Sequence, residues 1–171
     1  MKRHLPLALL TTLALLPALV AAGLYWGGWR SEGHRAHGRF LTPPAALADA
    51  PGLTRGDWTL LYLTPAACDP VCVKALHGLR MAHRAQGGEQ GRVRRLALTP
   101  DAALARDLAA ADPGLAAQPA PPALRARLGD ALPGIYLIDP QGYAILRYAP
   151  DADPRGLRQD LAHLLKHSWV G

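Results

Sequence analysis

Residues 58–72, Trp-Thr-Leu-Leu-Tyr-Leu-Thr-Pro-Ala-Ala-Cys-Asp-Pro-Val-Cys, decide the fold of this chain. The short apolar run in their first half is bounded by turn-forming residues and predicts a buried strand. A helix is expected over 70–86, because Pro70 suits a first helical position, where a missing N–H costs nothing. Cys68 and Cys72, the only cysteines, therefore lie where the strand gives way to the helix. Two cysteines so placed can form a disulfide or hold a soft metal such as Cu(I).

The rest of the chain extends this beginning into an α/β pattern. Strands are expected at 92–98, 134–139 and 143–148, and helices at 101–111, at 123–128 and from Asp153 onward. Only Pro140-Gln-Gly142 separates the last two strands, so they should form an antiparallel hairpin, whereas the first two strands should be parallel. The order predicts a thioredoxin-like fold, with a mixed four-stranded sheet flanked by helices. Such folds carry a cis-proline before the third strand, facing the cysteines, and Pro133 occupies that place.

The N-terminal residues 1–28 read as a membrane anchor. Lys2 and Arg3 precede 22 uncharged residues, Leu5 to Trp26, which would extend over roughly 33 Å as a helix. The small residues at 20–22 leave a cleaved signal peptide as the alternative. Flanking charges are nearly balanced, so the orientation is inferred from the use of such segments in export and from the paired cysteines. These features predict a single-pass protein of a bacterial inner (cytoplasmic) membrane, with its C-terminal domain in the periplasm.

Composition bounds the remaining choices. The chain of 171 residues, half of them hydrophobic, is long enough for one ordinary domain after the anchor. We expect a linker segment at 29–56 and the thioredoxin-like domain at 57–171. The net charge of +6 is scattered and forms no basic face with readout elements, so nucleic-acid binding is not predicted. No nucleophile elbow, phosphate loop or zinc ligand set is present, so hydrolase and nucleotide chemistry find no support.

The cysteine pair carries the chemistry. Cys68 should be the more exposed and reactive thiol, because it sits just before a helix N-terminus, where the positive end of the helix dipole lowers a thiol pKa. Asp69 between the cysteines is a candidate helix cap. Thiol oxidoreductases usually have two residues between their cysteines, and here there are three. This spacing still allows a disulfide, and it also allows two thiolates to grip one Cu(I) ion.

The chain resembles the SCO/SenC family, in a divergent branch of short bacterial proteins. The resemblance rests on the anchor, on Cys-Asp-Pro-Val-Cys at 68–72, and on Ile-Tyr-Leu-Ile-Asp-Pro-Gln-Gly at 135–142, and it covers about 130 residues. It implies a membrane-anchored, thioredoxin-like protein that delivers copper, or reducing power, to the copper centre of cytochrome c oxidase. The implied partner is the oxidase subunit with that centre, or another copper or thiol protein.

The resemblance also implies a third copper ligand that this sequence lacks. Copper-binding members carry a histidine shortly before the third-strand motif, and the matching position here is about Ala131. Other histidines could in principle replace this third copper ligand, but each fits a solvated position, or one too far from the cysteines, better than a position where it shares a metal ion with them. These histidines are His34, His37, His77, His83, His163 and His167. Two thiolates alone could still hold Cu(I), which accepts low coordination.

Three functions remain open at this point. The first is thiol–disulfide exchange during oxidase assembly, with Cys68 attacking a partner disulfide, Cys72 resolving the mixed disulfide and Pro133 holding the partner strand. The second is a Cu(I) metallochaperone without catalytic turnover, with Cys68 and Cys72 as metal ligands. The third is a scaffold in which the two cysteines form a structural clip.

Overall fold

A computed structural model describes residues 5–26, 36–127 and 133–168, and in the first range it describes side chains at 13–23 and 26. The chain divides into two units, residues 1–35 and 36–171. In the first unit, helix α1 runs over Leu5–Trp26. Among the residues whose side chains are described, no helix is long and apolar enough to cross a membrane.

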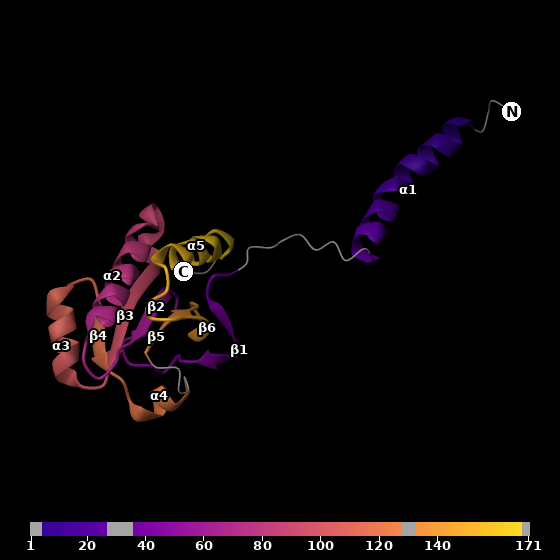
Figure 1. Ribbon diagram of the computed structural model, residues 1–171. Coiled ribbons are helices and arrows are strands. Elements are labelled where there is room, and N and C mark those ends of the chain that lie inside the picture. The colour runs from indigo at the N-terminus through magenta and orange to yellow at the C-terminus, as the bar shows by residue number, and fades with distance from the viewer. Residues whose placement is uncertain (1–4, 27–35, 128–132, 169–171) are drawn as a thin grey trace. The chain divides into compact units, whose positions relative to one another are not determined.

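The second unit is built on one mixed sheet of six strands, in the order β1-β6-β5-β2-β3-β4 (Figure 1). The strands are β1 Arg39–Ala46, β2 Trp58–Leu63, β3 Val93–Thr99, β4 Ala116–Pro119, β5 Gly134–Ile138 and β6 Tyr143–Tyr148. The four central strands are those expected from the sequence. The prediction of a four-stranded sheet was wrong because two edge strands, β1 and β4, extend it.

Both additional strands escaped prediction for the same physical reason. β1 contains Pro43 and Pro44 and lies in the segment expected to be a linker, and β4 has the short sequence Ala-Ala-Gln-Pro. Proline lacks a backbone donor, but an edge strand can leave that side of its ladder unpaired. β1 pairs antiparallel with β6, and β4 pairs parallel with β3. The bond between Thr42 and Pro43 is cis.

Strand β2 lies inside the sheet and is buried along its whole length. It pairs in parallel with β3 and antiparallel with β5, and the β5–β6 hairpin is antiparallel, as expected. Side chains alternate between the faces of a strand. Leu60 and Tyr62 therefore enter one core, and Leu61 and Leu63 enter the other.

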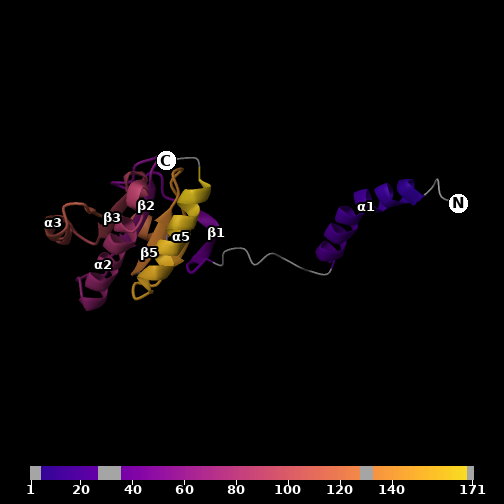
Figure 2. The same cartoon turned by 90° about the horizontal axis from the view of Figure 1, so that it is seen from above.

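Helices cover both faces of the sheet. The helices are α2 Pro70–Arg84, α3 Ala102–Ala111, α4 Pro122–Arg127 and α5 Pro154–His167, with a 3₁₀ turn, η1, at Gly87–Arg92. α2 and α5 lie side by side on one face (Figures 1 and 2), where Leu79 and Leu161 join the first core. Leu124 of α4 and Leu47, which directly follows β1, help to cover the other face. The expected helix starts at Asp101 and Asp153 are confirmed as N-caps.

The start of the second unit is fastened to α5 by one buried carboxylate. Asp160 Oδ2 accepts hydrogen bonds from the backbone N–H of His37 (2.8 Å), the backbone N–H of Gly38 (3.0 Å) and the hydroxyl of Tyr148 (2.7 Å). A Cβ on Gly38 would lie 2.6 Å from the Tyr148 ring, so only glycine fits without movement. This contact joins β6, α5 and the segment leading into β1.

Candidate functional site

Cys68 and Cys72 form a disulfide at the N-terminus of α2, with their Cα atoms 5.1 Å apart. Cys72 is completely buried in the first core, whereas Cys68 is half-buried. The sulfur open to an incoming partner is therefore that of Cys68, the member of the pair expected to be more exposed.

Asp69 sets the start of the helix that carries the pair. Its Oδ1 accepts a hydrogen bond from the backbone N–H of Cys72 at 2.8 Å, which satisfies one of the free donors of the first turn. Pro70 occupies the first helical position, as expected. The capping role of Asp69 is thus confirmed, and Cys68 lies immediately outside the first turn, where the helix dipole favours a thiolate.

Tyr62 brings a buried hydroxyl to the end of β2 that leads to the cysteines. Burial raises the pKa of Tyr62 to about 12, and the charge of Asp69 adds to the increase. The hydroxyl finds no hydrogen-bond partner among the described residues. Tyr62 therefore stays protonated at neutral pH and adds an uncharged, buried side chain to the core that also contains Cys72.

Pro133 lies at the same end of the sheet as the cysteines. In the antiparallel register of β2 and β5, Leu63 faces Gly134, so the residue before Gly134 lies next to the loop that follows β2. Pro133 itself is half-buried. Its peptide bond is made with Leu132, which lies outside the described residues, so the cis geometry and the contact with a partner strand stay predictions.

The described residues contain no group of three or more His, Cys, Asp or Glu side chains that could hold a metal ion. Position 131, matched to the family histidine, and His34 lie outside the described ranges. His37 Nδ1 lies 3.1 Å from Asp160 Oδ1, and His83 Nε2 lies between the carbonyl oxygens of Gln90 and Val93 at 3.2 and 3.1 Å. The soft donors at the start of α2 are the two cysteine sulfurs, which could serve as metal ligands only when reduced.

A groove of about 250 Å³ begins at Cys68 and runs between α2 and α3. Its walls include Val73, Leu76 and His77 from α2 and Leu108 from α3. His77 is thus on a different side of the helix from the buried Cys72, as the sequence suggested, yet it lines the same hollow as Cys68. No local sequence pattern predicts this groove, because α3 reaches it only through the packing of the sheet.

A charged cluster closes the far end of this groove. The carboxylate of Asp112 accepts a hydrogen bond from Arg80 Nη2 at 2.9 Å, and Arg95 binds both of its oxygens. The two guanidinium groups lower the pKa of Asp112 to about 2, and the hydrogen bonds from Arg95 make the largest contribution. Two cations therefore share one anion, and the cluster keeps a formal charge of +1 next to the groove.

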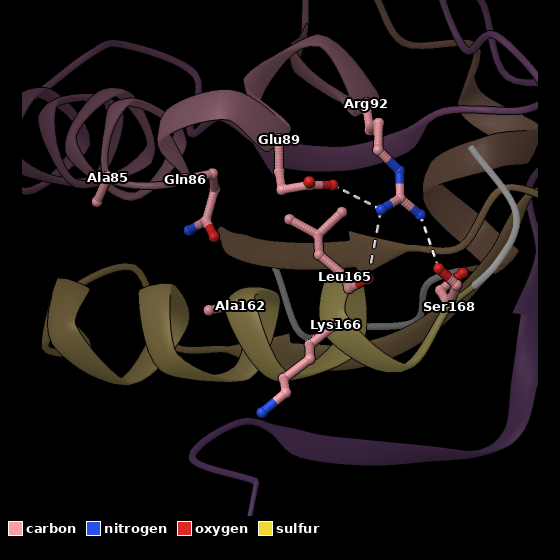
Figure 3. Close-up of a pocket in the computed structure, with 8 residues that line it drawn as sticks. All are labelled: Ala85, Gln86, Glu89, Arg92, Ala162, Leu165, Lys166 and Ser168. Carbon is pink, nitrogen blue, oxygen red and sulfur yellow. Dashed lines mark hydrogen bonds and ion pairs between the residues drawn. The ribbon is translucent and has the colours of Figure 1, made fainter.

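A second cavity, of about 540 Å³, lies between η1 and the end of α5 (Figure 3). Arg92 donates a hydrogen bond to Glu89 Oε2 within η1 at 2.6 Å, and it donates across the cavity to the carbonyl oxygens of Leu165 and Ser168 at 3.3 and 2.8 Å. Carbonyls at a helix end lack partners within the helix, and a cation there is favourable. We therefore assign this cavity to the packing of a helix end, and neither cysteine lines it.

Comparisons with known proteins agree with this geometry. Residues 58–168 match the family described as transmembrane-like, thioredoxin-like, C-terminal domain. No curated protein matches the sequence. The fold is similar to that of apo Sco1 from Thermus thermophilus, with 17% identity, a TM-score of 0.58, and coverage of 80% of this chain and 98% of that one.

Two further solved structures show the same fold. Yeast Sco1 with copper bound has 16% identity and a TM-score of 0.55, over 67% of this chain and 81% of that one. A thiol:disulfide interchange protein from a Bacteroides species has 15% identity and a TM-score of 0.51, over 67% and 76% of the two chains. The likeness confirms the expected SCO-like thioredoxin fold.

Proposed function

The chain belongs to the transmembrane-like, thioredoxin-like C-terminal domain family, and from this premise we propose that it assists assembly of the copper centre of cytochrome c oxidase by thiol–disulfide exchange. The observation that carries the proposal is the disulfide at the N-terminus of α2, with Cys68 half-buried and Cys72 fully buried. This arrangement exposes one sulfur to a partner and keeps the other within reach of it.

The exchange begins with both cysteines reduced. The Cys68 thiolate attacks one sulfur of a partner disulfide, a mixed disulfide forms, and the partner's other sulfur leaves as a thiolate. The Cys72 thiolate then attacks the Cys68 sulfur, which closes the 68–72 disulfide and releases the partner's second thiolate. Two electrons pass to the partner, and an external dithiol must reduce the protein again. Pro133 would hold the partner strand beside the sulfurs.

Cu(I) delivery is the second candidate, favoured by the likeness in fold to yeast Sco1 with copper bound. Here copper is cargo, and the reduced sulfurs of Cys68 and Cys72 would hold it. Two thiolates suit the soft Cu(I) ion in near-linear geometry. The described residues supply no further ligand group, so Cu(II) would be held poorly.

One experiment separates these two functions. The reduced full chain is titrated anaerobically with Cu(I) against a competing chelator, beside a Cys68→Ser/Cys72→Ser variant, and both are tested for reduction of a model disulfide. Exchange without tight copper binding supports the oxidoreductase. Stoichiometric copper binding that the double variant loses supports the chaperone, and failure of both assays leaves the structural clip.

We also propose that residues 1–28 anchor the protein in a bacterial inner (cytoplasmic) membrane as a single span, with residues 57–171 in the periplasm. The support is the 22-residue helix α1, which carries no charged residue, and Lys2 and Arg3 ahead of it. The chain should stay in the membrane fraction after alkaline extraction with its N-terminus intact. A mature protein that begins just after Ala22 would instead indicate a cleaved signal peptide.

A further inference from the structure

We propose that the groove between α2 and α3 receives the polypeptide segment that flanks the partner's reactive cysteine, and that Arg80 selects an acidic side chain in this segment. The inference rests on the proposed exchange at Cys68 and adds the chemistry of the partner. The segment should carry apolar side chains next to its cysteine and a carboxylate farther along.

The position of Cys68 is the first support. Cys68 lines the groove, so a partner sulfur bonded to it would lie beside the groove. The Cα atoms of a disulfide usually lie about 4.4–6.8 Å apart, which brings the partner's backbone directly to this opening. Residues next to the partner's cysteine then have a hollow of about 250 Å³ beside them.

The apolar part of the groove lies nearest to Cys68. Val73 is 59% exposed although it follows the buried Cys72, and Leu76 and Leu108 line the walls with it. An exposed valine one turn from an active sulfur loses its contact with water when a partner covers it, which favours binding. The first residues beyond the partner's cysteine should therefore be apolar.

The far end of the groove carries the charge. Arg80 shares the Asp112 carboxylate with Arg95, so Asp112 cannot neutralise both guanidiniums. The side chain of Arg80 is 35% exposed, so it remains open to another carboxylate. A charge-assisted hydrogen bond from a guanidinium is about twice as strong as a neutral one.

The length of α2 sets the spacing. Arg80 lies 11 residues beyond the N-cap Asp69, about 16 Å along the helix axis, and its side chain leans back toward Cys68. An extended peptide advances about 3.3 Å per residue. The partner's carboxylate should therefore lie about three to five residues from its cysteine.

The test uses the full chain with Cys72→Ser, so that a mixed disulfide at Cys68 cannot be resolved. The probes are ten-residue peptides whose single cysteine carries a chromogenic thiol leaving group and is flanked by leucine. A glutamate or a lysine is placed at each distance from two to seven residues, on either side of the cysteine. A neutral small disulfide, bis(2-hydroxyethyl) disulfide, reports the reactivity of Cys68 without the groove.

Glutamate three to five residues away should speed the reaction about tenfold over lysine, and salt should reduce this difference. Arg80→Gln should abolish the preference, and because Arg95 still binds Asp112, the fold should persist, as thermal unfolding will check. The matched control is Arg84→Gln, one turn farther along α2 and outside the groove, which should keep the preference. Val73→Asp should slow every leucine-flanked peptide relative to the neutral small disulfide, because it places a charge in the apolar part of the groove.

Two results would overturn the proposal, and they can be told apart. Equal rates for glutamate and lysine peptides, with normal reaction of the neutral disulfide, refute the groove and leave the exchange function standing. No reaction of Cys68 with any disulfide refutes the exchange function, and the groove proposal fails with it.

Discussion

Asp160→Ala should destabilise the second unit by about 4 kcal/mol. One oxygen of this carboxylate accepts three hydrogen bonds, from the backbone N–H groups of His37 and Gly38 and from the Tyr148 hydroxyl, and the residue is only 1% exposed. Each buried donor left without an acceptor costs about 1–3 kcal/mol. Removing one member of a buried charged network costs about 3–5 kcal/mol. This range agrees with the total cost for the three donors if water reaches some of them in the variant.

Urea unfolding of the full chain, followed by circular dichroism and tryptophan fluorescence, measures this loss. For a slope of about 2 kcal/mol/M, the midpoint should fall by about 2 M. Asp160→Asn keeps an oxygen where the three donors meet and loses the charge, so it should cost about 1–2 kcal/mol. Asp107→Ala is the control, because this aspartate of α3 is exposed and should leave the midpoint unchanged.

A double-mutant cycle decides whether the network explains the loss. Tyr148→Phe should cost about 1–2 kcal/mol in the natural chain and clearly less when Asp160 is already alanine, because the hydroxyl then has lost its acceptor. Equal costs in both backgrounds, or a loss below about 1 kcal/mol for Asp160→Ala, would refute the reasoning.

Three further predictions rest on single observations. Tyr62→Phe should leave stability unchanged or raise it by about 1 kcal/mol in urea unfolding, because it removes a buried hydroxyl that has no described partner; a loss above about 1 kcal/mol would contradict this. The pKa of Asp112 is lowered to about 2, so its stabilisation, about 1–2 kcal/mol once solvent screening is allowed for, should be complete above about pH 5 and disappear as the pH falls through 2. Asp112→Asn should flatten the unfolding free energy over that range, and an unchanged pH profile would argue against the pairing. Gly142→Ala should lower the free energy of unfolding by more than about 1 kcal/mol, because Gly142 has φ +94° and an added Cβ would lie 2.8 Å from the Ala48 backbone; an unchanged melting temperature would count against this.

Much of this protein is encoded in short stretches of sequence. The strand before the cysteines, the Asp69 cap with Pro70 behind it, and the tight hairpin at 140–142 depend on neighbours a few residues away. Local hydrogen bonds and apolar periodicity specify such features without the rest of the fold. The sequence alone therefore determined the four central strands, the pair of cysteines at the strand–helix junction and the thioredoxin-like class.

Other features depend on residues far apart in the chain, and only the tertiary structure decided them. β1 has a proline-containing sequence typical of a loop and becomes a strand because β6 offers it an edge. The groove beside Cys68 exists because the packing of α3 brings Leu108 opposite α2, and Asp112 then meets Arg80 across 32 residues of chain. Asp160 reaches His37 across 123 residues. No local pattern records such distant pairs, because the free energy that selects them arises only when the sheet brings them together.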